Sequence, residues 1–167
     1  MRKLILSCLF IVCITAFGGC NLYGKMISNY NEDEKYIKAL CDEIVRCFDE
    51  KDIEELKLMF CSGSQKYYDL DSESQNAISV YGSKSTSFII SGKTPTGMKC
   101  DGKWVDQHYI PLIKNIITES GEEFEIGFCV YKIYDDNTDK VGIGVISLEN
   151  SEGDELAVIG GYDWDNN

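Results

Sequence analysis

The sequence predicts an α+β fold, in which helices come first and a run of hairpin-linked strands then forms a curved antiparallel sheet. Apolar side chains recur at helical spacing between positions 37 and 48, whereas positions 124–130 alternate strictly between apolar and other residues. Asp101-Gly102 is a strong two-residue hairpin turn, and a strand-like segment follows it. We therefore expect the N-terminal helices to pack on one face of the sheet.

The clearest predicted helix follows Asn31, which we expect to cap it. Acidic residues occupy positions 32–34, where they suit the positive end of the helix dipole. Its apolar stripe consists of Ile37, Leu40, Cys41, Ile44, Val45 and Phe48. A segment of three charged residues, 49–51, ends this helix.

Two further helices are predicted before the sheet. Asp52 and Glu55 form a capping-box-like pair at the start of one, and Gly63 is expected to end it. Another helix is predicted over residues 71–81, with Gly82 at its C-terminal end. The period of the apolar residues changes after Gly82, which marks the start of the sheet.

The predicted strands share short apolar runs between turn residues. They cover residues 87–90, 103–105, 109–117, 124–133, 141–145 and 156–159. Pro111 favours an edge position or a bulge. Along the strand at 124–133, Tyr131 and Ile133 are expected to share the face opposite Phe124 and Val130. Residues 163–167 are expected to be frayed.

The first twenty residues have the composition of a signal peptide. Arg2 and Lys3 precede an uncharged apolar run over residues 4–15, and the small residues Gly18-Gly19 come directly before Cys20. This segment resembles the lipobox of bacterial lipoproteins, where the cysteine thiol is acylated and becomes the N-terminus. The apolar run is shorter than the ~20 residues needed to span a bilayer.

This interpretation divides the chain into three parts and gives it a location. Residues 1–19 are expected to be the cleaved lipoprotein signal peptide, residues 20–31 the lipidated cysteine and a tether, and residues 32–167 a single α+β domain. Palmitate or a related acyl chain on Cys20 would hold the protein at the extracytoplasmic face of the cell membrane. The lipid bilayer is therefore one expected partner.

The chain is acidic, with 16 Lys and Arg against 28 Asp and Glu and a net charge of −12. Loss of Arg2 and Lys3 with the signal peptide lowers the basic count to 14 and makes the net side-chain charge −14. Nucleic acid is not expected as a partner, because its phosphates would repel such a chain.

The cysteines and short motifs give no evidence of a metal or a cofactor, and none is expected. Five cysteines remain after Cys20, namely Cys41, Cys47, Cys61, Cys100 and Cys129, and no two of them form a C-x-x-C pair. Most are interpreted as small buried hydrophobes, with one disulfide left open. Asp135, Asn137 and Asp139 begin like a calcium loop, but Lys140 stands where that loop needs glycine.

Candidate ligand contacts come from the sheet, because the helical stripes are used by the core. Trp104, His108, Tyr131 and Tyr134 combine apolar rings with polar groups suited to binding. Asp106 and His108 are two residues apart, so Trp104, Asp106 and His108 are expected to share one face of a strand.

Three segments together resemble an uncharacterised bacterial lipoprotein family, domain of unknown function 5104. They are the lipobox ending at Cys20, the segment DIEELKLMF at 52–60 and the segment VGIGVISL at 141–148. The resemblance covers most of residues 32–150 and implies a cystatin-like, nuclear-transport-factor-like fold. In that fold, sheet and helices enclose a cone open at one end, and Trp104 or Tyr131 is expected to line its mouth. The family implies no catalytic residues.

Three functions remain open at this point. We favour a non-catalytic module that binds a small molecule or a protein. One alternative is an enzyme of the ketosteroid-isomerase or dehydratase type, with Asp106 or His108 as base and Tyr131 as hydrogen-bond donor. The other is an accessory or dimerisation domain, so that both a monomer and a homodimer are compatible with the sequence.

Overall fold

The computed structural model describes residues 31–161. Positions 31–50 are helical, and this segment is called helix 31–50 below. Three short helices follow it: α2 (Ile53–Leu58), α3 (Ser62–Tyr67) and α4 (Leu70–Tyr81). The strands are β1 (Ser85–Ser91), β2 (Thr96–Cys100), β3 (Lys103–Tyr109), β4 (Leu112–Thr118), β5 (Glu123–Tyr134), β6 (Gly142–Asn150) and β7 (Glu155–Gly160), with a 3-10 turn at Thr138–Lys140 between β5 and β6.

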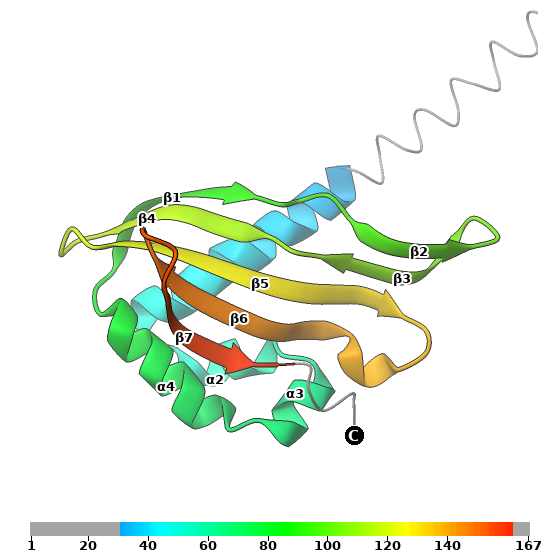
Figure 1. Ribbon diagram of the computed structural model, residues 1–167, viewed down its shortest axis with the longest axis horizontal. Coiled ribbons are helices and arrows are strands. Elements are labelled where there is room, and N and C mark those ends of the chain that lie inside the picture. The colour runs from blue at the N-terminus through cyan, green and yellow to red at the C-terminus, as the bar shows by residue number, and fades with distance from the viewer. Residues whose placement is uncertain (1–30, 162–167) are drawn as a thin grey trace, which may run out of the picture.

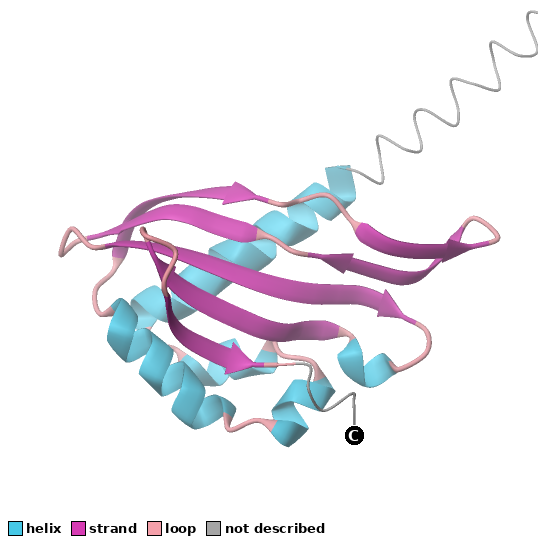
Figure 2. Ribbon diagram, viewed as in Figure 1, coloured by secondary structure: helices cyan, strands magenta, loops and turns pink. Residues whose placement is uncertain are grey.

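The helices lie on one side of the sheet, which confirms the predicted α+β class. Figure 1 shows helix 31–50 running diagonally behind the sheet, while α2, α3 and α4 gather near β7. The opposite face of the sheet, turned toward the viewer in Figure 2, carries no helix of the described chain. We call it the uncovered face.

The seven strands form one antiparallel sheet with five rows. Strand β5 is long enough for β4 and β3 to pair with successive parts of the same side, while β6 pairs with its other side. β1 and β2 lie along one edge, and β7 forms the other. The chain breaks pairing between β3 and β4 at Ile110-Pro111, as expected for a residue that lacks an N–H.

The core lies between helix 31–50 and the sheet. Ile37, Cys41 and Ile44 are fully buried against strand residues such as Ile126 and Ile146. The alternation along β5 is confirmed, because positions 124, 126, 128 and 130 are all buried. Leu40, which belongs to the predicted stripe, is half-buried at the margin of this core.

Two helix boundaries follow from side-chain caps. The Asp52 side chain accepts the Glu55 N–H at 3.2 Å and caps α2 as predicted. α4 ends at Gly82, which has φ +77° and therefore the backbone conformation that favours glycine.

Two other boundary predictions were wrong. Position 31 already lies within the helix, so Asn31 is not its cap. Gly63 does not end α2, which stops at Leu58; it lies buried inside the unpredicted α3, which the Cys61 side chain caps. The α3 segment, SGSQKY, has no apolar residues at helical spacing, so its sequence did not predict a helix.

The described cysteines are free, and Cys41, Cys47 and Cys61 are buried as expected. Cys100 is exposed and Cys129 is half-buried. The proposed signal peptide, Cys20, the tether and the C-terminal segment 163–167 lie outside the described residues. Within residues 31–161, no helix is long and apolar enough to cross a membrane.

Candidate functional site

The uncovered face of the sheet carries a compact group of polar and aromatic side chains, formed by β3 and β5. His108 Nδ1 lies 2.9 Å from Asp106 Oδ1, and both side chains are largely buried. The His108 ring lies 4.9 Å from that of Tyr131, its partner in the pairing of the two strands. An ionised carboxylate only accepts hydrogen bonds, so His108 Nδ1 is the donor in this pair and Asp106 the acceptor.

A bulge in β5 adds Tyr134 to this group. His108 pairs with Tyr131 and Gln107 with Ile133, so Lys132 is an extra residue in the pairing. The bulge places Tyr134 beside Tyr131, with their rings 5.1 Å apart. It also places Ile133 on the opposite face, so the prediction that Tyr131 and Ile133 share a face was wrong.

A second bulge removes Trp104 from the group. Met98 pairs with Asp106, but Lys99 pairs with Trp104, which leaves Val105 as an extra residue. Met98 and Lys99 are consecutive and point to opposite faces, so Trp104 and Asp106 also lie on opposite faces. The predicted shared face of Trp104, Asp106 and His108 was therefore wrong, and the Lys99 ammonium lies 4.2 Å from the centre of the Trp104 ring.

A lysine, a thiol and a carboxylate modify the environment of the tyrosines. The Lys140 ammonium lies 4.6 Å from the centre of the Tyr134 ring, and Lys140 is buried. Burial raises the pKa of the Tyr131 hydroxyl, and the nearby Cys129 and Asp106 raise it further. Tyr131 is therefore neutral at physiological pH and able to donate a hydrogen bond.

These side chains do not lie in the space between helices and sheet. Residues on β3 that face helix 31–50 are Gln107 and Tyr109, whereas His108 and Tyr131 lie on the uncovered face. Of the two residues expected to line the mouth of an internal cone, Tyr131 therefore lies on the other face of the sheet, whereas Trp104 lies on the helix-facing side. The cone itself stays a prediction. A role of Trp104, His108, Tyr131 and Tyr134 in ligand binding stays a prediction.

Sequence reasoning missed a polar cluster on the helix-facing side. The buried Asp33 carboxylate accepts from Lys132 Nζ at 2.7 Å and from Gln107 Nε2 at 3.4 Å. Gln107 also donates to the Tyr109 hydroxyl at 2.7 Å. Burial is the largest cause that raises the pKa of Tyr109, and the Asp33 carboxylate raises it further. Lys132 is itself exposed, so its sequence context did not indicate that it pairs with a buried carboxylate.

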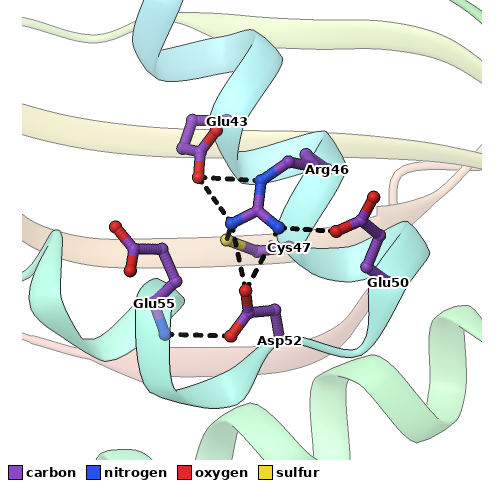
Figure 3. A network of polar contacts seen from close by, with 6 residues as sticks. All are labelled: Glu43, Arg46, Cys47, Glu50, Asp52 and Glu55. Carbon is purple, nitrogen blue, oxygen red and sulfur yellow. Dashed lines mark hydrogen bonds and ion pairs between the residues drawn. The ribbon is translucent and has the colours of Figure 1, made fainter.

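A further network joins helix 31–50 to α2 (Figure 3). The Arg46 guanidinium contacts Glu43 at 2.6 Å, Glu50 at 2.7 Å and Asp52 at 3.1 Å. Hydrogen bonds to these carboxylates raise the pKa of Arg46. Because Asp52 also caps α2, the Arg46 network links the end of helix 31–50 to the start of α2.

Among residues 31–161, no group of three or more His, Cys, Asp or Glu side chains is arranged to hold a metal ion. A shallow groove of about 340 Å³ does lie on the uncovered face, next to the aromatic group. It runs over β4, β5 and β6, and Ile110, Leu112, Gly127, Cys129, Val145 and Ser147 are among its lining residues.

The fold and its surfaces define a class: a single α+β domain whose helices cover one face of an open antiparallel sheet and leave the other face uncovered. A family model described as a domain of unknown function (DUF5104) matches residues 43–151, and the chain belongs to this family. The predicted membership of domain of unknown function 5104 is thereby confirmed, whereas lipoprotein status and a cystatin-like fold stay predictions. No curated protein matches the chain.

Proposed function

We propose that the protein is a lipid-anchored, non-catalytic module that binds its ligand or partner through the uncovered face of the sheet. The observation that carries the proposal is the arrangement of that face. It combines the half-buried rings of His108, Tyr131 and Tyr134 with an adjoining apolar groove. Aromatic rings with polar tips and shallow apolar grooves are typical of recognition surfaces.

The anchoring part of the proposal rests on the N-terminal sequence. The basic residues Arg2 and Lys3, the uncharged apolar run and Gly18-Gly19 before Cys20 fit a lipoprotein signal peptide. Two acyl chains on Cys20 are sufficient for stable attachment, because each buried CH₂ contributes about 0.8 kcal/mol. The domain would then act close to the extracytoplasmic surface of the cell membrane.

Metabolic labelling with an alkyne analogue of palmitate tests the anchor. We expect the wild-type protein to be labelled and to sediment with membranes, and Cys20→Ser to be unlabelled. Cys47→Ser, which removes a buried thiol, is the matched control and should keep the label. Labelling of Cys20→Ser, or release of the wild type into the soluble fraction, would contradict lipid attachment.

A second candidate function has one specific observation in its favour. The hydrogen bond from His108 to Asp106 orients the imidazole, whose Nε2 would be the proton acceptor when the ring is neutral, and the Tyr131 ring lies beside it. Such a pair suits proton abstraction next to a carbonyl group, the reaction of ketosteroid-isomerase-type enzymes.

Conversion of a β,γ-unsaturated ketone to its conjugated isomer, followed by ultraviolet absorbance, tests the enzyme. The binding-module proposal predicts the same slow rate for wild type, His108→Gln and a protein-free blank. Turnover by the wild type that His108→Gln abolishes would favour the enzyme instead.

A further inference from the structure

The groove on the uncovered face exists because one strand residue has no side chain. Gly127 lies at its centre on β5, between Leu112 on β4 and Ser147 on β6. A Cβ atom at Gly127 would lie 3.0 Å from Ser147 Oγ and 3.6 Å from Leu112 Cδ1. The hollow therefore has Leu112 on one flank and the Ser147 hydroxyl on the other, with Val145 and Cys129 also in its lining, and Ile110 at its rim is 63 % exposed.

Three glutamates form a row across the uncovered face beside this groove. Glu125 on β5 pairs directly with Glu149 on β6, which pairs in turn with Glu155 on β7. Like charges directly opposite each other destabilise a sheet. None of the three carboxylates forms an ion pair with another described residue.

The charge of this region indicates the kind of molecule that would fit. Glu149 lines the groove itself, and Ser147 Oγ, 3.4 Å from Glu149 Oε1, is the one described side-chain donor in contact with its carboxylate. Lys114 on β4 shares the face, and Lys140 lies beside Tyr134, but neither of these described lysines forms an ion pair with a glutamate of the row. Basic side chains next to the groove would relieve the repulsion between the glutamates, while apolar side chains would fill the hollow.

The same charges argue against two other occupants. A second copy of this chain would bring its own three glutamates against these in an isologous contact, because both copies use the same patch. An anionic membrane surface would be repelled in the same way. A partner protein with a segment that is both basic and apolar would neutralise the glutamates and fill the hollow.

We propose that the groove on the uncovered face binds a polypeptide segment of a partner protein that combines apolar side chains with lysine or arginine. This inference rests on the proposed function and names its partner. The apolar side chains occupy the hollow over Gly127, and the basic side chains pair with Glu149 and Glu155. Charge complementarity of this kind governs which partners associate.

Site-specific photo-crosslinking tests the proposal. The full-length protein carries a benzophenone amino acid at position 110, in nanodiscs of neutral phosphatidylcholine. The probe is a short amphipathic peptide of leucine and lysine. We expect a covalent adduct with this peptide, and about fivefold less adduct when serine replaces its leucines or glutamate replaces its lysines.

A matched pair of double variants separates the groove from general charge effects. Glu149→Gln with Glu155→Gln removes two charges beside the groove, and we expect about fivefold less adduct. Glu32→Gln with Glu55→Gln removes two exposed charges on the helical side and should change the yield by less than about twofold.

Equal losses in the two double variants, or no peptide adduct at all, would overturn the proposal. An adduct between two copies of the chain, or with lipid, in place of the peptide adduct would assign the groove to another occupant and would also overturn it. None of these results affects palmitate labelling of Cys20, so failure of this inference is distinguishable from failure of the anchor.

Discussion

Asp49 connects three segments of the chain through one carboxylate near the end of helix 31–50. It accepts the Ser85 N–H and the Ser85 hydroxyl, both at 2.7 Å, and the Tyr81 hydroxyl at 3.1 Å. The end of α4 and the start of β1 are therefore held against helix 31–50. Few residues in the described chain link so many elements.

We expect Asp49→Ala to lower the free energy of unfolding by about 1–3 kcal/mol, because buried donors lose their acceptor. Denaturant titration of the two proteins measures the difference. Asp49→Asn keeps one oxygen acceptor and should cost less. Equal stability of wild type and Asp49→Ala would show that water replaces the carboxylate without cost.

Burial also controls the reactivity of the thiols. It raises the pKa of Cys41 and of Cys47 to about 12, with nearby carboxylates adding to the effect. The thiolate is the reactive form, so both are expected to resist alkylation in the folded protein. Cys100 is exposed at the end of β2 and should react.

Iodoacetamide at pH 8, followed by mass spectrometry of the peptides, tests this expectation. Cys100 should be alkylated at least about tenfold faster than Cys41 or Cys47. Denaturant should abolish the difference. Rapid alkylation of Cys41 without denaturant would mean that helix 31–50 leaves the sheet readily.

At the scale of elements, the sequence predicted most of what depends on periodicity. Helix 31–50 and the alternation of β5 follow from the spacing of their apolar residues, because one buried face dictates the pattern. The turn at Asp101-Gly102 was also predictable, since both residues adopt positive φ there, +49° and +79°.

The candidate site was predicted less well, and the reason is physical. A bulge inserts one residue and reverses the faces of all residues beyond it, without a reliable sequence signal. Bulges at Val105 and Lys132 moved Trp104 and Ile133 to unexpected faces and brought Tyr134 beside Tyr131. The groove depends on Gly127, whose role is set by its neighbours across the sheet.

Helix 31–50 supplies the element-scale prediction. Ile44 is fully buried at the centre of the helix, whereas Leu40 is half-buried at the core margin. We expect Ile44→Ala to cost about 2–5 kcal/mol in free energy of unfolding, as for other large-to-small core changes. Leu40→Ala removes the same class of side chain and should cost less, because part of it already contacts solvent.

Denaturant titration of both variants gives the comparison, with the slope of the transition as a check on two-state behaviour. A loss for Ile44→Ala below about 1 kcal/mol would mean that the helix is not docked as described. A larger loss for Leu40→Ala than for Ile44→Ala would mean that helix 31–50 is rotated about its axis, with Leu40 and not Ile44 at the centre of the buried face.

At the scale of the whole molecule, one set of helices and one face of a sheet share a single core, and no described helix covers the other face. The core contains polar groups that must stay neutral, since burial raises the pKa values of Cys41, Cys47, Tyr81 and Tyr109. In the unfolded chain these groups ionise at their ordinary values, 9.0 for the thiols and 10.0 for the phenols. The folded protein therefore binds more protons than the unfolded chain above about pH 9.

Because the folded protein binds more protons, the free energy of unfolding decreases as the pH rises above about 9. The contribution of these buried neutral groups to the free energy of unfolding is fully present below pH 9. It is lost as the pH rises toward the folded-state pKa of about 12 for Cys41 and Cys47. We expect the free energy of unfolding, measured by urea titration at pH 8, 9, 10 and 11, to fall progressively above pH 9. Cys41→Ala should make this fall shallower, whereas Cys100→Ala, which removes an exposed thiol, should leave its slope unchanged. A free energy of unfolding that stays constant from pH 8 to 11 would show that the buried thiols and phenols reach water before the protein unfolds, and hence that the core opens locally.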